Sequence, residues 1–235
     1  MQDFGEAFAT AFALVARADS ALLEIVGLSL TVTLTAVLIA SAIALPLGAI
    51  LAVARFPGRG AVIAALNALM GLPPVVLGLV VYLMLSRAGP LGPLGLLYTP
   101  TAMIIAQTLL VLPIIAALTR EAVQDLHGEY GELLRSMRAG RAAVLGTLLW
   151  DGRHRLLTAI LAGLGRAFAE VGAVMIVGGN IAHVTRVMTT AIALETSKGE
   201  IAMALALGMV LVALSFAINA ALMALQSGTV RHAEA

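Results

Sequence analysis

The sequence predicts an all-α integral membrane protein. Of its 235 residues, 61% are hydrophobic and only 11% are charged, and the mean hydropathy is +1.03. A chain with so few polar side chains cannot give a soluble domain a water-compatible surface. Uncharged runs recur along it, each long enough for a helix of about 20 apolar residues, the length that crosses a bilayer. Five transmembrane helices are expected, and a sixth is possible only if the N-terminal segment also spans the membrane.

The first element, residues 1–24, is expected to be an interfacial segment rather than a span. Phenylalanines recur at every fourth position, at Phe4, Phe8 and Phe12. This spacing places three rings on one side of a helix that can lie at the membrane surface. Arg17 and Asp19 follow the apolar sequence and argue against a sixth span.

The five spans follow from the uncharged runs, and together they make one membrane domain over residues 25–226. They cover residues 25–54, 61–86, 101–119, 156–177 and 201–225. The sequence RFPGRG separates the first two spans, because proline and glycine break helices and the two arginines stay in water. The proline-rich sequence AGPLGPLGLLYTP is expected to form a loop before the third span.

The arginines predict the orientation of the chain. One set of connections carries Arg55, Arg59, Arg120, Arg135, Arg138, Arg141, Arg153, Arg155 and Arg231. The opposite side keeps only Arg17, Arg87, Arg186 and Lys198. Cytoplasmic loops of membrane proteins carry the excess of basic residues. We therefore expect an N-terminus outside the cell and a cytoplasmic C-terminal tail over residues 227–235.

Residues 120–155 form a charged segment between the third and fourth spans, long enough for two short helices at the membrane surface. Its apolar side chains would lie beside basic ones, with Leu133, Leu134 and Met137 next to Arg138 and Arg141. Apolar anchors with a charged rim are typical of a surface that docks into a partner's groove. A solvated connector between two spans is the alternative.

Arg166 and Glu170 are the two ionisable residues inside the fourth span. They are four residues apart, so on a helix they share a face and can form an ion pair. The pair could close a transport pathway, or it could only pin the helix in the bundle. Proton relay through Glu170 in a secondary transporter is a third interpretation.

A polar segment follows the fourth span. Glycines and an asparagine are expected to end the helix in a tight turn, at Gly178, Gly179 and Asn180. Further hydrogen-bond donors follow at Thr185, Arg186, Thr189 and Thr190. Amides, hydroxyls and a guanidinium together suit an oxyanion, so these residues are candidates for the entry path. Helix termination followed by an ordinary outside loop is the alternative.

Several kinds of chemistry are not expected in this chain. It has no cysteine, and its four histidines are scattered, so a metal site is not expected. The one lysine, Lys198, has no glycine-rich turn before it that could hold phosphates. The chain is therefore expected not to be an enzyme and to bind no cofactor. If ATP drives it, the nucleotide and its Mg²⁺ belong to a separate ATPase subunit. No nucleic-acid partner is expected.

The runs E-V-G-A-V-M-I-V-G-G-N-I at 170–181 and T-R-V-M-T-T-A-I-A-L-E-T-S-K-G at 185–199 closely resemble the permease subunit of tungstate-type ATP-binding-cassette importers. The resemblance implies the type I importer permease fold and a homodimer in the inner membrane of a prokaryote. It also implies two ATPase subunits and an extracytoplasmic oxyanion-binding protein as partners. Molybdate or sulfate is the alternative cargo. An ion-coupled secondary transporter, or a scaffold that recruits a soluble protein, is the alternative from another class.

The resemblance also implies a coupling motif that contacts the ATPase. Its E-A-A positions are occupied by Glu132, Leu133 and Leu134. The sequence departs from the motif further on, because Arg138 stands where a glycine usually falls and Gly140 is displaced by two residues. Trp150 and Asp151 stand where Leu-Pro would close the motif.

Overall fold

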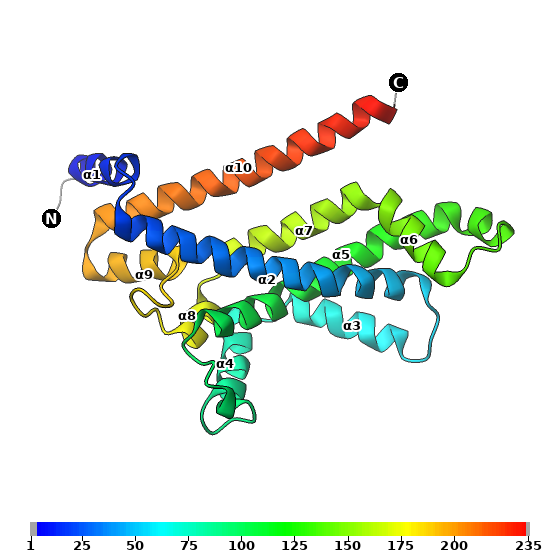
Figure 1. Ribbon diagram of the computed structural model, residues 1–235, viewed down its shortest axis with the longest axis horizontal. Helices are drawn as coiled ribbons and strands as arrows, with labels where there is room; N and C mark the ends of the chain where they lie inside the picture. The colour runs from blue at the N-terminus through cyan, green and yellow to red at the C-terminus, as the bar shows by residue number, and fades with distance from the viewer. Residues whose placement is uncertain (1–3, 234–235) are drawn as a thin grey trace.

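The computed structural model describes residues 4–233, and every regular element in that range is helical. The all-α prediction is therefore confirmed for this part of the chain (Figure 1). In chain order the elements are α1 (Phe4–Ala16), α2 (Ser20–Val53), α3 (Arg59–Met70), α4 (Pro74–Leu85), the 3-10 helix η1 (Gly92–Leu94), α5 (Pro100–Ser136), α6 (Arg141–Asp151), α7 (Arg153–Phe168), α8 (Gly172–Gly178), α9 (Met188–Lys198) and α10 (Ile201–Ala233).

Three of the described helices are long and apolar enough to cross a membrane. They are α2, α5 and the Ile201–Ala220 part of α10, and all three run along the long axis of the molecule (Figure 1). Two further pairs, α3 with α4 and α7 with α8, are bent by 105° and 61°. The described residues therefore hold three candidate spans, or up to five if each bent pair is one span.

Helices α2 and α5 pack closely at the centre of the bundle. Along one face of α2, every fourth residue is small and buried, at Ala36, Ala40, Ala44, Gly48 and Ala52. A Cβ atom added to Gly48 would lie only 2.5 Å from the carbonyl oxygen of Ala116 in α5. In lipid the hydrophobic effect does not drive helices together, so small residues that let backbones approach are what allow such packing.

Helix α1 is separate from the first long helix and packs across the start of α10 (Figure 1). It buries Ala7 and Ala11 and leaves Phe8 and Phe12 exposed. The first long helix begins at Ser20, earlier than predicted. The Asp19 side chain accepts hydrogen bonds from the first amides of α2 and so caps its N-terminus.

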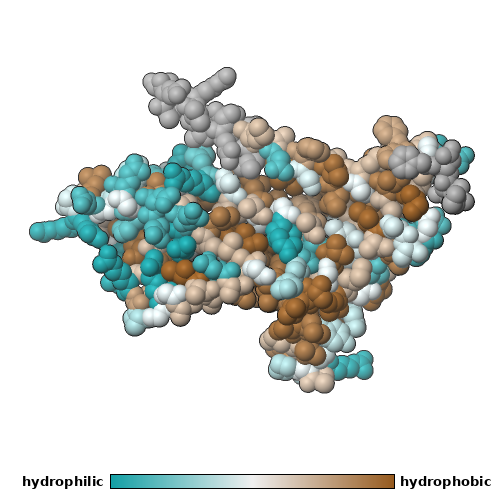
Figure 2. Space-filling view, turned by 180° about the vertical axis from the view of Figure 1, so that it is seen from behind, coloured by the Kyte–Doolittle hydropathy of each residue, from teal (hydrophilic) through white to brown (hydrophobic). Residues whose placement is uncertain are grey.

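The second span is not the single helix that was expected. It breaks between Met70 and Pro74, and α4 leaves α3 at 105°. Pro73 and Pro74 explain the break, because neither has an N–H to donate and each restricts the residue before it. Helix α4 consequently protrudes from the bundle, and its surface is strongly apolar (Figure 2).

The predicted segment 120–155 also differs from expectation. Instead of two separate short helices, α5 continues to Ser136, and only α6 is short. Apolar side chains continue the helical period past the end of the predicted span, and Val123, Leu126 and Leu134 pack into a core with Leu148 of α6. This core explains why α5 does not end at the charged residues. Hydrophilic side chains gather over the α5–α6 end of the molecule (Figure 2).

The expected C-terminal tail is helical as far as it is described, because α10 continues to Ala233. Residues 234–235 of the tail lie outside the described residues.

Candidate functional site

The fourth span, expected to be one helix, breaks at residues 169–171, where α7 and α8 meet at 61°. Glu170 lies in this break. Its carboxylate accepts a hydrogen bond from the amide of Ala173 at 2.8 Å, and in this way it satisfies a free N–H at the start of α8. The expectation of a continuous helix was wrong, and competition from this carboxylate for the amide is the physical reason.

Arg166 and Glu170 nevertheless form the predicted ion pair, with 3.1 Å between Arg166 Nη1 and Glu170 Oε2. The Glu170 side chain is 2% exposed and that of Arg166 is 32% exposed. The carboxylate is therefore fully enclosed while the guanidinium reaches the surface of the protomer. Two donors hold the carboxylate, which offsets the cost of enclosing a charge in a low dielectric.

Gln107, which sequence reasoning missed, lies beside this pair. It is 3% exposed, and its Nε2 donates to the carbonyl oxygen of Ala167 at the end of α7 at 3.3 Å. Its Oε1 has no hydrogen-bond partner among the described residues. The available signal was that Gln107 is the single amide side chain within the uncharged third span.

A small cavity of about 10 Å³ adjoins Gln107 and Glu170. Ser29 and Thr33 of α2 and Thr189 of α9 complete its polar wall. A cavity of this size holds about one water molecule, which could donate to the free Gln107 oxygen. The break between α7 and α8 is thus enclosed by polar groups from three other helices.

Helix α9 is fixed to this cluster at its start. The Thr189 hydroxyl donates to the carbonyl oxygen of Glu170 at 2.7 Å. The amide of Met188 donates to the Ser29 hydroxyl, also at 2.7 Å. These bonds connect residues far apart in sequence, so any movement of the break must involve α9 and α2.

The Gly-Gly-Asn turn ends α8, as expected. Gly179 and Asn180 both have left-handed backbone conformations, with φ of 72° and 51°. The Thr185 hydroxyl donates to the carbonyl oxygen of Gly178 at 2.6 Å and accepts from the amide of Ile181 at 3.0 Å. Thr185 is completely buried, so it holds the turn from inside.

The loop before α5 closes over this turn. The amide of Tyr98 donates to the carbonyl oxygen of Val177 at 2.9 Å. A Cβ atom at Gly179 would lie 2.9 Å from the Tyr98 ring, so this position requires glycine for space as well as for its positive φ. A hydrogen bond with Tyr82, together with partial burial, raises the pKa of the Tyr98 hydroxyl above its usual value.

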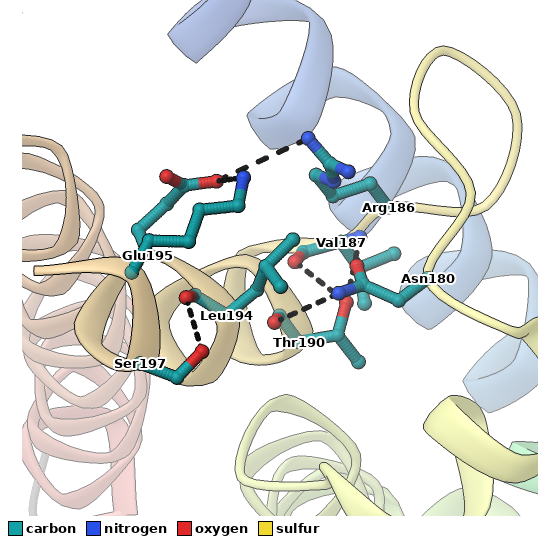
Figure 3. A network of polar contacts seen from close by, with 8 residues as sticks. Asn180, Arg186, Val187, Thr190, Leu194, Glu195 and Ser197 are labelled. Atoms are coloured by element: carbon teal, nitrogen blue, oxygen red, sulfur yellow. Dashed lines mark hydrogen bonds and ion pairs between the residues drawn. The ribbon is translucent and has the colours of Figure 1, made fainter. Parts of the chain in front are cut away.

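Arg186 belongs to a second charged group, on α9 and the loop before it (Figure 3). Its Nη1 lies 4.0 Å from Glu195 Oε1, and Lys198 Nζ lies 3.0 Å from the same oxygen. Asn180 Nδ2 donates to the carbonyl oxygen of Thr190 at 3.3 Å and ties the turn to α9. Glu195 and Lys198 were not assigned a role from the sequence, although both lie in the motif that carried the resemblance.

The three candidate threonines all donate their hydroxyl protons to backbone carbonyl oxygens: Thr185 to Gly178, Thr189 to Glu170 and Thr190 to Val187. In the described conformation they hold the segment together. Asn180 and Arg186 therefore remain the candidates with the most capacity to meet an anion, and their role stays a prediction.

The predicted coupling residues lie at the end of α5 and the start of α6. Leu133 and Met137 are 59% and 69% exposed, whereas Leu134 packs inward on the core beneath α6. Glu132 and Arg141 are exposed on either side of the turn. Two of the three expected apolar anchors are therefore available to a partner.

The sequence departs from the coupling motif at the turn between α5 and α6, and the structure shows the backbone conformation of this turn. Arg138 has a φ of 54°. Its amide bonds to the carbonyl oxygen of Arg135, and the amide of Ala139 bonds to that of Leu134, which together make a Schellman motif. Arg138 therefore occupies the left-handed position that favours glycine, and Gly140 directly precedes α6 with an extended backbone.

Among residues 4–233, no three His, Asp or Glu side chains gather closely enough to hold a metal ion.

Comparison with known proteins adds a family relationship. No family model matches the chain. It is 42% identical over 226 residues to the tungstate uptake system permease protein TupB of Peptoclostridium acidaminophilum, covering 96% of this chain and 99% of that protein. It is 40% identical over 204 residues to a probable anion ABC transporter permease protein of Haloferax volcanii, covering 85% of this chain and 88% of that protein. The molybdenum transport system permease protein ModB of Azotobacter vinelandii is more distant. It is 30% identical over 166 residues, which cover 65% of this chain and 72% of that protein.

Proposed function

Because the chain belongs to the family of permease subunits of anion-transporting ABC systems that includes TupB, we propose that it carries an oxyanion, tungstate, across the cytoplasmic membrane. The observation that carries this proposal is the match over nearly the full length of both chains. The lower identity to ModB favours tungstate over molybdate as cargo. Molybdate or sulfate is the alternative within the same class.

The protein is a multi-pass protein of a prokaryotic inner membrane, and we propose five spans with an outside N-terminus and a cytoplasmic C-terminus. In this arrangement each bent pair, α3–α4 and α7–α8, acts as one span. The α5–α6 turn then lies in the cytoplasm, and the segment from Gly179 to Lys198 lies near the outer surface. The excess of arginines at the α5–α6 end supports this orientation.

We propose that an ATPase subunit docks on the α5–α6 turn. Leu133 and Met137 would enter its groove, and Glu132, Arg138 and Arg141 would form the charged rim. ATP and Mg²⁺ would be held entirely by that subunit, because this sequence contains no glycine-rich phosphate-binding loop. Two such ATPases would serve a homodimer of this chain, and an extracytoplasmic binding protein would deliver the anion.

The homodimer is supported by the size of the polar cavity within one protomer. The cavity beside Glu170 is about 10 Å³, room for one water molecule rather than a tetrahedral oxyanion. A path between two protomers would avoid this constraint. Arg166, partly exposed at the α7–α8 break, is placed to contribute to a gate in such a path.

The proposed function is tested by measuring ATP hydrolysis. The purified chain would be reconstituted with its candidate ATPase, and binding protein loaded with tungstate, molybdate or sulfate would be titrated at matched concentrations. The expected result is that loaded binding protein stimulates ATP hydrolysis and that tungstate loads the binding protein at the lowest concentration. Equal stimulation by all three loaded forms would support an importer in which the binding protein, and not this chain, selects the anion. Failure to assemble with any ATPase would contradict the proposal and favour an ion-coupled transporter.

A further inference from the structure

A wide groove runs between α2, α6 and α7, away from the polar cluster at Glu170. Its volume is about 710 Å³. Much of its wall is aliphatic, formed by Leu45 and Pro46 of α2, Leu149 of α6, and Leu157 and Ile160 of α7. The α2 residues lie within a candidate span, so the groove extends to membrane depth. An apolar groove at this depth is open to lipid chains rather than to water.

One end of the groove is cationic and aromatic. Trp150, at the end of α6, is 70% exposed, and the Arg153 guanidinium lies 5.1 Å from the centre of its ring. Arg153 Nη1 also donates to the carbonyl oxygen of Trp150 at 2.9 Å. This is the one hydrogen bond of the Arg153 guanidinium found among the described residues, so N–H groups remain to meet a ligand. His154 lies on the same wall.

The charges around this end favour an anion. Among residues 4–233, no carboxylate lines the groove. The nearest acidic residue in sequence, Asp151, is exposed and does not line it, and Asp125 is paired with Arg155 at 3.3 Å. Arg153 is therefore the charged side chain that a ligand in the groove would meet.

We propose that this groove binds an anionic phospholipid. Its acyl chain would lie along Leu45, Leu157 and Ile160, and its phosphate would meet the free N–H groups of Arg153. Arginine recognises phosphate through two parallel N–H groups, and tryptophan is enriched where the apolar membrane meets the headgroups. Basic sites between transmembrane helices bind anionic headgroups in this way.

A lipid in this position would have a structural consequence for α6. It would contact α6 on one side and α2 and α7 on the other, and so attach the short helix to the membrane. Since Trp150 and Arg153 lie at the junction of α6 and α7, the lipid would hold that junction in place. This inference depends only on the membrane location of the chain and stands independently of the transported anion.

The single tryptophan of the chain makes the proposal testable, because Trp150 lies at the proposed headgroup site. The full-length chain would be placed in phosphatidylcholine nanodiscs containing a minor fraction of phosphatidylglycerol whose acyl chains are brominated close to the headgroup, where the bromine atoms can contact Trp150 and quench its fluorescence. Quenching by brominated phosphatidylglycerol should exceed quenching by the same fraction of brominated phosphatidylcholine. Arg153→Gln should weaken the preference about fivefold, the value of one basic residue at a lipid surface.

Two matched pairs of variants provide controls. Gly146 lines the groove, and a Cβ atom there meets nothing within 4 Å, so Gly146→Leu should fill the groove and reduce quenching without a clash. Gly128→Leu places the same side chain at another open helical position away from the groove and should leave quenching unchanged. Arg155→Gln removes an equal charge outside the groove and should also leave it unchanged.

Four results would overturn the proposal. The first is equal quenching by the anionic and the neutral lipid. The second is that the Arg153→Gln variant prefers the anionic lipid as strongly as the Arg155→Gln variant does. The third is loss of quenching when the ATPase binds or the chain dimerises, which would make the groove a protein interface. Competition by inorganic phosphate at equal concentration would show that the site takes phosphate without a lipid, and would also contradict the proposal.

Discussion

Replacing Arg166 alone should destabilise the protein more than replacing Arg166 and Glu170 together. The Glu170 carboxylate is 2% exposed and is held by Arg166 at 3.1 Å and by the Ala173 amide at 2.8 Å. Arg166→Gln leaves this enclosed negative charge without its counter-ion. In the double variant Arg166→Gln with Glu170→Gln, the new amide oxygen can still accept from Ala173 and no charge is enclosed.

The size of the difference follows from the burial of the two partners. Breaking a buried ion pair costs about 3–5 kcal/mol, and the lower value applies because Arg166 is already 32% exposed. In the double variant only about 1 kcal/mol is expected, the value of one hydrogen bond. At about 2–4 °C per kcal/mol for a chain of this size, the Tm should fall by about 6–12 °C in the single variant and about 2–4 °C in the double variant.

The assay is the loss of the monodisperse size-exclusion peak after fixed heating in one detergent, because membrane proteins unfold irreversibly and only matched conditions allow comparison. Glu170→Gln alone should fall between the other two, since the guanidinium it leaves behind can reach water. The pair would not offset the cost of enclosing Glu170 if the double variant were as unstable as Arg166→Gln. The same conclusion would follow if its fall in Tm equalled the sum of the falls in the two single variants.

Substituting Arg138→Gly should raise the Tm by about 2–4 °C, because the φ of 54° costs a side-chain-bearing residue about 1 kcal/mol; an unchanged Tm would mean that no strain is stored there. Substituting Glu132→Arg should reduce the amount of ATPase that co-purifies while leaving the Tm unchanged, and full co-purification would remove Glu132 from the interface. Gly48→Ala should lower the Tm by at least about 2 °C, since its Cβ would lie 2.5 Å from Ala116 O and overpacking costs about 1–3 kcal/mol. Gly27→Ala, where a Cβ atom meets nothing within 4 Å, is its control.

The helical class and membrane location could be predicted from composition because they depend on the average polarity of long segments. The breaks inside the spans depend on a few local contacts and were harder to predict. The Pro73–Pro74 pair could have revealed the α3–α4 bend, since two adjacent prolines cannot continue a regular helix. The α7–α8 break had no such signal, because it involves a Glu170 side chain that competes for a backbone amide only in the folded chain.

The same distinction holds for the candidate site. The Arg166–Glu170 pair was predictable because residues four apart meet through local geometry, and the contact survives the break in the helix. Gln107 meets Ala167 across 60 positions of sequence, and Ser29 meets Met188 across 159. Contacts of this kind follow from tertiary packing and leave no periodic pattern in the sequence.

The bonding of the threonines bears on where selectivity resides. Their side chains were predicted to suit an oxyanion, yet the hydroxyl protons of Thr185, Thr189 and Thr190 are used by backbone carbonyls. The carboxylate of Glu170 would moreover repel an anion that entered the cavity beside it. An anion passing between two protomers would instead meet a few partly exposed donors such as Arg186 and Asn180. Such contacts are weak, and weak contacts permit fast release. Discrimination among tungstate, molybdate and sulfate should therefore reside in the binding protein that delivers the anion rather than in this chain.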